Sequence, residues 1–189
     1  MIHWQYSELM ETFKKSVIPL VIKKHNMDKA AIQLNLLVKM TIMAWDAQNS
    51  YLNKLISSLS DDQLLKEISP GRNTGIYLLG HLIAVSDAMI PLLGWGNRLF
   101  PELEEPFIKT PDKSGQAMPS VSELKEKLVA VNSKLSLYFQ SVNVDEWLSR
   151  HTSVSADDFE KEPHRNKLNV VISRTNHMAN HIGQMILLT

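Results

Sequence analysis

Two histidines near the end of the chain have the spacing of metal ligands. His177 and His181 are four residues apart in a segment with helical periodicity, so both imidazoles leave one side of a helix about one turn apart. Two nitrogens placed in this way can bind one metal ion. The residue after His177 is Met178, so the His-Glu-x-x-His signature of metalloproteases is absent. The pair indicates either a metal site of another class or two neighbouring surface histidines.

His81 is the candidate for a third ligand. It lies in the apolar segment Tyr-Leu-Leu-Gly-His-Leu-Ile, next to Gly80, whose missing side chain lets another backbone or a ligand approach closely. Gly80 also lowers helix propensity by roughly 1 kcal/mol relative to Ala, which indicates a packing or binding reason for its presence. Two interpretations stay open: His81 is a metal ligand, or it is a core histidine beside a glycine that allows close helix packing.

Three imidazoles with an open fourth position match the ligand set of catalytic zinc, whose bound water has a pKa of about 7. Imidazole also suits nickel and ferrous iron, so the residues alone do not choose the metal. The chain has no cysteine, which excludes disulfides, thiolate metal sites, Fe–S clusters and a cysteine nucleophile. Any metal must therefore be held by the seven histidines and the carboxylates.

The histidine pair lies beside the apolar stripe of its helix, so it lines a groove between helices or faces solvent. Other polar residues are candidates for the same groove. Arg174 and Gln184 fall on the same flank as the histidine pair. Arg174 is a candidate to bind a substrate carboxylate, with a surface ion pair as the alternative. Gln184 or Asn180 is a candidate to orient a ligand. For Tyr77 and Asn49, packing at the edge of the core is the alternative to a place in the groove.

The remaining four histidines are expected on the surface. His3 and His25 lie near the N-terminus, and His151 and His164 lie in segments rich in Ser, Asp and Glu. His164 and Arg165 directly precede the last predicted helix, so they are placed to reach the mouth of a site at the end of a bundle.

Helical periodicity dominates the chain. Apolar residues at three- and four-residue steps predict four helices, at about residues 28–59, 74–93, 121–141 and 166–189. Sustained two-residue alternation is absent from the sequence. We therefore predict an all-α four-helix bundle.

Two segments fall outside this pattern. Residues 94–119 are dense in glycine and proline and predict a long crossover loop without regular elements, after which Ser120 and Glu123 form a capping box. The first 26 residues carry a weaker helical stripe that Pro19 interrupts. The predicted organisation is an N-terminal extension of residues 1–26, which covers the bundle or a neighbouring subunit, and a domain of residues 27–189.

Composition restricts the partners. The chain has 189 residues, 44% of them hydrophobic and 21% charged, which is typical of one folded, soluble domain. Twenty basic residues balance twenty acidic ones, so no general positive field favours binding to nucleic acid. The N-terminus lacks the apolar run of a secretory signal, and no run approaches the roughly 18 apolar residues of a membrane span. We expect a cytoplasmic protein that binds neither nucleic acid nor membranes.

Gly80-His81-Leu82 together with the string His177-Met178-Ala179-Asn180-His181-Ile182-Gly183-Gln184 resembles the DinB-like superfamily of metal-binding four-helix bundles. That group includes YfiT-type proteins and low-molecular-weight-thiol S-transferases, and the resemblance extends from about residue 30 onward. It implies that His81, His177 and His181 are the metal ligands and that the ion is zinc or nickel. It also implies an up-up-down-down bundle that forms a homodimer and does not bind DNA.

Three functions remain open. The first is a metal-dependent enzyme, a thiol S-transferase or a hydrolase, in which water or a thiol on the metal attacks a small molecule. The second is a non-catalytic bundle that binds a metal or a small ligand, because no Asp or Glu lies at helical spacing from the three histidines as a general base. The third is a structural bundle that acts only through dimerisation. The substrate depends on residues 94–119 and 149–166, which carry no recognisable motif.

Overall fold

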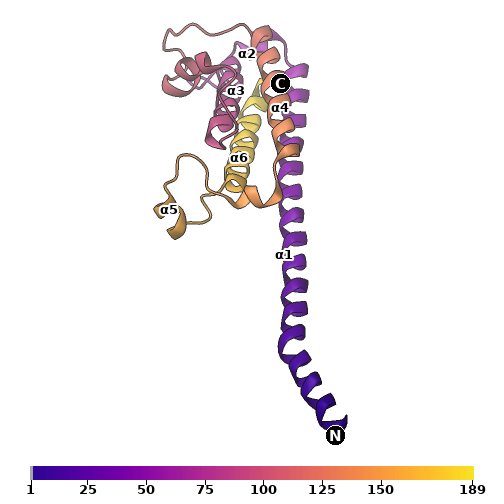
Figure 1. The fold of residues 1–189 in the computed structure, drawn as a ribbon. Coiled ribbons are helices and arrows are strands. Elements are labelled where there is room, and N and C mark those ends of the chain that lie inside the picture. The colour runs from indigo at the N-terminus through magenta and orange to yellow at the C-terminus, as the bar shows by residue number, and fades with distance from the viewer. Residues whose placement is uncertain (1) are drawn as a thin grey trace. The chain divides into compact units, whose positions relative to one another are not determined.

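The computed structural model describes the backbone of residues 2–189 and the side chains of Lys15 and residues 29–189 (Figure 1). Across this described part the chain is helical and forms no strand beyond the isolated bridges Glu67–Thr74 and Arg150–Asn166. The predicted all-α class is confirmed. The chain divides into two units, Met1–Met40 and Thr41–Thr189.

The first unit consists of helix. α1 covers Ile2–Ser58, although the sequence predicted a helix that begins near Asp28 after a break at Pro19. α1 passes through both positions, so neither Pro19 nor Asp28 ends the helix, although proline in a helix interior is unfavourable. The predicted apolar stripe of the first 26 residues, His3 and His25 lie outside the described side chains. The boundary between residues 26 and 27 stays a prediction.

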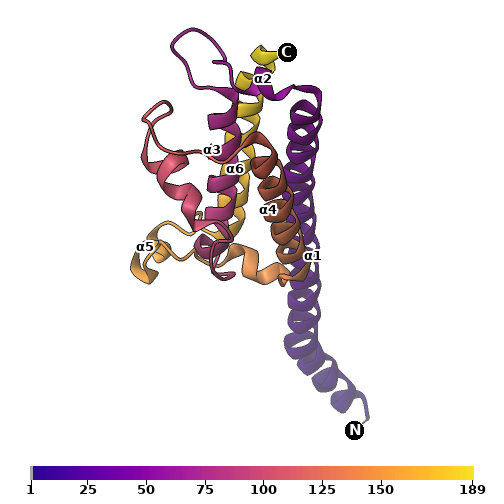
Figure 2. The same ribbon diagram turned by 90° about the horizontal axis from the view of Figure 1, so that it is seen from above.

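The second unit is a four-helix bundle, shown from two directions in Figures 1 and 2. Its helices are the end of α1, α3 (Gly75–Leu92), α4 (Val121–Ser141) and α6 (Lys167–Met185). Thr74 caps α3, and the capping box at the start of α4 is present as predicted. α3 and α6 lie within a few residues of their predicted ranges as well, and α1 ends one residue before its predicted end.

Apolar faces of the four helices form the core. Trp45 of α1 is 2% exposed and packs edge-on against Phe139 of α4, with ring centroids 5.9 Å apart. Most of α3 is buried. Among the described residues, α3 is the one helix long and apolar enough to cross a membrane, and 72% of that window is buried inside the bundle.

Contacts between helix ends define the directions of the helices. Gly75, at the start of α3, lies against Leu188, just beyond the end of α6. At the other end of α3, the carbonyl of Leu92 accepts a hydrogen bond from the backbone N–H of Thr152, which precedes α6. α3 and α6 are therefore antiparallel. Trp95, just after α3, stacks on Tyr138 near the end of α4, so α3 and α4 are parallel.

α1 runs opposite to α4, because Trp45 contacts Phe139 while Lys125, near the start of α4, forms an ion pair with Asp61, just after α1. The helices thus run up, down, down and up, and the expected up-up-down-down order is wrong. The lengths of the connections explain this order of directions. Residues 59–74 join α1 to α3 by a short reversal, whereas the long segment after Leu92 returns the chain to the other end of the bundle.

The long crossover has more structure than its glycines and prolines suggested. It contains a 3₁₀ turn over Pro101–Leu103 and a π-helical turn over Glu105–Lys109. Asp87 of α3 is fully buried and accepts the backbone N–H groups of Leu99 and Phe100 at 2.8 and 3.0 Å. These hydrogen bonds and the buried Phe107 hold the crossover against α3.

The shorter elements complete the second unit. α2 covers Asp61–Leu64 and begins with a capping box at Ser60, and α5 covers Ala156–Lys161. Two 3₁₀ turns follow α4 and α6, over Val144–Leu148 and Ile186–Leu188. α5 lies where the sequence predicted an irregular stretch. The 3₁₀ turn over Ile186–Leu188 lies where the sequence predicted that the last helix continues.

Candidate metal centre

The three histidines predicted as metal ligands lie together between α3 and α6. His177 Nε2 lies 3.2 Å from His81 Nε2 and 3.0 Å from His181 Nε2. One ligand atom from each of the three lies within 4.8 Å of the others. Among the described residues, no other group of three or more His, Cys, Asp or Glu side chains comes close enough to hold an ion.

Hydrogen bonds to the outer ring nitrogens orient two of the imidazoles. His81 Nδ1 lies 2.7 Å from the carbonyl of Phe107, and because a carbonyl only accepts, the proton is on Nδ1 and the lone pair on Nε2. His181 Nδ1 donates in the same way to Gln184 Oε1 at 3.0 Å. Metal-binding histidines are commonly held by such partners, which fix the tautomer and the ring orientation.

The spacing of the Nε2 atoms fits a bound divalent ion. Two nitrogens on a tetrahedral zinc with bonds of about 2.0–2.1 Å are about 3.4 Å apart. The observed separations of 3.0 and 3.2 Å differ from this by only a few tenths of an ångström. Without an ion or a proton between them, these lone pairs would face one another and repel. The donor set therefore fits a metal held by His81, His177 and His181.

Burial keeps two of the three imidazoles, His81 and His177, in the form that binds metal. Burial is the largest cause that lowers the pKa of His177 to about 4, followed by the two neighbouring imidazoles and Arg174. Burial also lowers the pKa of His81, against the opposing effect of its hydrogen bond to Phe107. Neutral imidazole is the ligand form, so both groups are ready to bind a metal at neutral pH.

Gly80 explains how the crossover reaches His81. A Cβ atom at Gly80 would lie 2.2 Å from Cε1 of Phe107, so only glycine lets this ring pack directly on α3. The same packing brings the Phe107 carbonyl to His81 Nδ1. The two interpretations of Gly80 and His81 therefore merge: the glycine allows close packing, and that packing orients the histidine.

Tyr77 supports the same segment. Its ring lies nearly parallel to His81 with centroids 6.3 Å apart, and its hydroxyl donates to the carbonyl of Thr110 at 2.9 Å. The role of the Phe107 carbonyl escaped the sequence analysis, because a backbone acceptor leaves no residue-type signal and depends on the π-helical turn.

Arg174 lies one turn before His177 and is half-buried. Its guanidinium makes no hydrogen bond or ion pair within the described part of the chain, so the surface ion pair offered as an alternative is absent there. It lines a cavity of about 300 Å³ with His151, His164 and Arg165. None of the three clustered histidines lines this cavity, so the placement of His164 and Arg165 at the mouth of the metal site stays a prediction. His151 is half-buried, although it was expected on the surface.

Two other candidates lie apart from the histidines. Asn49 is buried on α1, where its side-chain amide donates to the carbonyl of Trp45 at 3.1 Å. The cavity that Asn49 lines, about 680 Å³, is bordered by α1 residues and by none of the three histidines. Asn180 is exposed on α6 and has no hydrogen-bond partner among the described side chains.

Comparison with known proteins identifies the family. No curated protein matches the chain. A conserved protein from Enterococcus faecalis shares the fold, with a TM-score of 0.56 and 14% identity over 79% of this chain and 93% of that one. The family model of the DinB superfamily matches residues 44–185, which include all three histidines. The chain therefore belongs to the DinB superfamily.

Proposed function

We propose that this protein is a metal-dependent enzyme that acts on a small molecule, by thiol S-transfer or by hydrolysis. The observation that supports the proposal is the convergence of three Nε2 atoms, two of them on imidazoles whose outer nitrogens are already hydrogen-bonded. Structural bundles have no need for such an arrangement, since three half-buried histidines cost desolvation without filling the core efficiently.

The residues of the chain would share the work as follows. His81, His177 and His181 hold the ion, and Phe107 and Gln184 fix the orientation of two of these rings. When bound, a divalent ion supplies a deprotonated water or thiol at neutral pH. Arg174 places positive charge beside the histidines and can bind a substrate carboxylate.

One observation favours a non-catalytic bundle that binds a metal or a small ligand. The hydrogen-bond partners of the three imidazoles among the described residues are a backbone carbonyl, an amide and one another, with no carboxylate. A general base of the usual kind is thus missing from these contacts. Turnover of thiols with electrophiles, or of esters and amides, would separate the enzyme from this alternative.

Metal analysis tests the proposal directly. Protein purified without a nickel column is expected to contain about one divalent ion per chain, and His81→Ala and His177→Ala are expected to lose it. His164→Ala is the matched control, because His164 is exposed and lies outside the cluster. Metal-free wild-type protein that also fails to take up zinc or nickel in dialysis would refute the proposal.

We also propose zinc or nickel as the ion, a cytoplasmic location and a homodimer. Support for the dimer comes from α1, where Ile32, Leu36 and Met40 follow one another at four-residue steps and are 57–68% exposed. Such a stripe is typical of a helix that packs against a partner. Light scattering would show a dimer of the wild type and a monomer after Leu36→Glu if this stripe forms the interface.

A further inference from the structure

We propose that the cavity between the start of α6 and residues 149–166 binds the anionic group of the substrate, a carboxylate or a phosphate, with Arg174 as its main ligand. This inference rests on the proposed function, because it names the class of substrate that would reach the three histidines. It makes the substrate a small organic anion.

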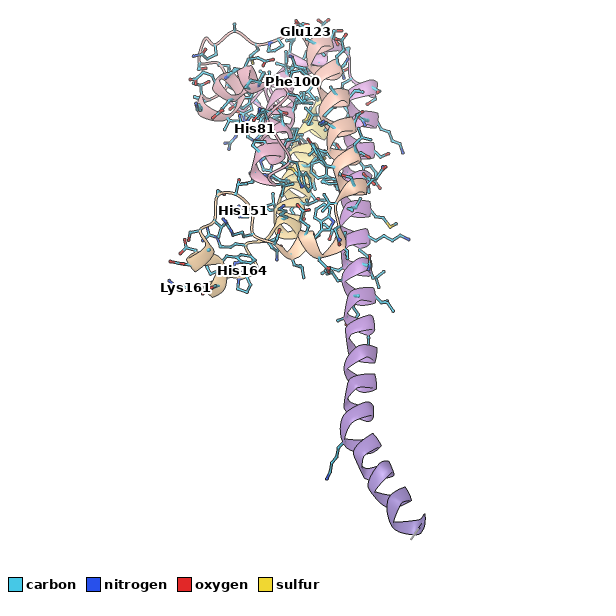
Figure 3. All side chains as sticks on the ribbon, viewed as in Figure 1. His81, Phe100, Glu123, His151, Lys161 and His164 are labelled. Carbon is cyan, nitrogen blue, oxygen red and sulfur yellow. The ribbon has the colours of Figure 1, made fainter. Side chains whose placement is uncertain are left out.

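The cavity has the lining expected for an anion. Its volume is about 300 Å³, near the lower end of the range for small-molecule sites. The lining contains no Asp or Glu. Most of it consists of side chains with N–H or O–H groups, namely those of Arg174, Ser173, Asn169, Asn166, His151 and His164. Figure 3 shows His151 and His164 on the segment that leads into α6.

Arg174 distinguishes this cavity from an ordinary polar depression. Arg165 at the rim is paired with Glu162 at 3.1 Å, so its charge is largely compensated. Arg174 has no such partner among the described residues, although it is half-buried. Since a guanidinium removed from water loses solvation, an unpaired one is a ready ligand for carboxylate or phosphate.

The position of Arg174 connects the cavity to the metal centre. Arg174, His177 and His181 occupy successive turns on one side of α6. An anion bound to the guanidinium would therefore have the rest of its molecule one turn away from the imidazoles. The net charge of the chain is zero, so the attraction for an anion must come from local charges such as that of Arg174.

Calorimetric titration with succinate and with inorganic phosphate tests the proposal. Both are added to metal-free and to zinc-loaded full-length protein, so that binding in the metal-free state cannot come from coordination to the ion. We expect saturable binding of at least one anion and a loss of about tenfold or more in affinity in Arg174→Gln. The stronger of the two anions tells whether the substrate group is a carboxylate or a phosphate.

Arg72→Gln is the matched control, because Arg72 is exposed on the loop before α3 and its loss changes the net charge equally. It should bind both anions like the wild type. Equal affinity of Arg174→Gln and wild type, or no binding of either anion, would overturn the inference. Because metal content is measured separately, anion binding without stoichiometric metal would remove the proposed function and leave the anion site standing.

Discussion

Burial lowers the pKa of His177 and so makes the stability of the folded protein depend on pH. Its pKa is about 4, mainly because it is buried, whereas a histidine in the unfolded chain titrates near 6.5. Between these values the unfolded chain binds a proton and the folded chain does not. Acidification through this range therefore favours unfolding of the metal-free protein.

We expect the stability of the metal-free protein to be fully retained above pH 6.5 and to fall as the pH drops toward 4. Urea unfolding at pH 7, 5.5 and 4.5 measures this decline. In His177→Gln the decline should be smaller, because the titrating group is gone. A variant with the same pH dependence as the wild type would show that other groups cause it.

Gly80→Ala should damage both packing and metal binding. The new methyl group would meet three atoms of the Phe107 ring at 2.2–2.6 Å, so the ring and its turn must move. His81 would then lose its hydrogen-bonded carbonyl, and loss of such a partner typically lowers metal affinity about 10–100-fold. Gly183→Ala, where a Cβ would meet nothing within 4 Å, is the control and should bind zinc like the wild type in competition with a chelating dye.

The three histidines could be predicted as metal ligands from the sequence, but the groups that hydrogen-bond to them could be predicted only in part. Helical spacing placed His177 and His181 on one side of a helix, and Gln184 on the same flank. His81 joins them through tertiary packing of α3 on α6, which periodicity alone does not determine. The Phe107 carbonyl depends on a local backbone conformation, so no pattern of side chains could point to it.

At the scale of elements, Asp87 links α3 to the crossover. Its buried carboxylate accepts two backbone N–H groups, at Leu99 and Phe100. Asp87→Ala leaves both donors without this acceptor, and we expect a loss of about 2–4 kcal/mol in the free energy of unfolding. Denaturant unfolding of the metal-free protein measures the loss. Asp145→Ala, at an exposed position, should change stability by less than about 0.5 kcal/mol.

Helices with clear end signals were predicted well, and those without them were not. Ser120 and Glu123 mark the start of α4 in the sequence as they do in the structure. For α1 the predicted start rests on Asp28 as a helix-opening residue, but the helix is continuous through this position and begins at Ile2. In the crossover, buried side chains such as Leu103 and Phe107 stabilise short helical turns against local preferences.

For the whole molecule, the metal should act as a crosslink between distant parts of the chain. The site joins α3 to α6 and forms only when the bundle is folded. An ion that binds the folded state alone stabilises it by about 2.7 kcal/mol at a concentration 100 times its Kd. For a chain of this length that corresponds to a rise of about 5–10 °C in Tm.

Thermal unfolding with and without added zinc, followed by a chelator, measures this effect. The Tm of wild-type protein should rise with zinc and fall back with the chelator, while His81→Ala should respond to neither. A rise of the same size in His81→Ala would place the stabilising ion elsewhere.

The parallel arrangement of α3 and α4 also limits how the protein can be redesigned. Because α3 has 18 residues, the connection to α4 must travel back about 27 Å, which roughly eight extended residues could cover. The natural connection is several times longer and folds against α3. A trimmed version could preserve the bundle, but it would delete the carbonyl that orients His81. The surplus chain is thus where new specificities can be inserted, provided that Phe107 and its turn are kept.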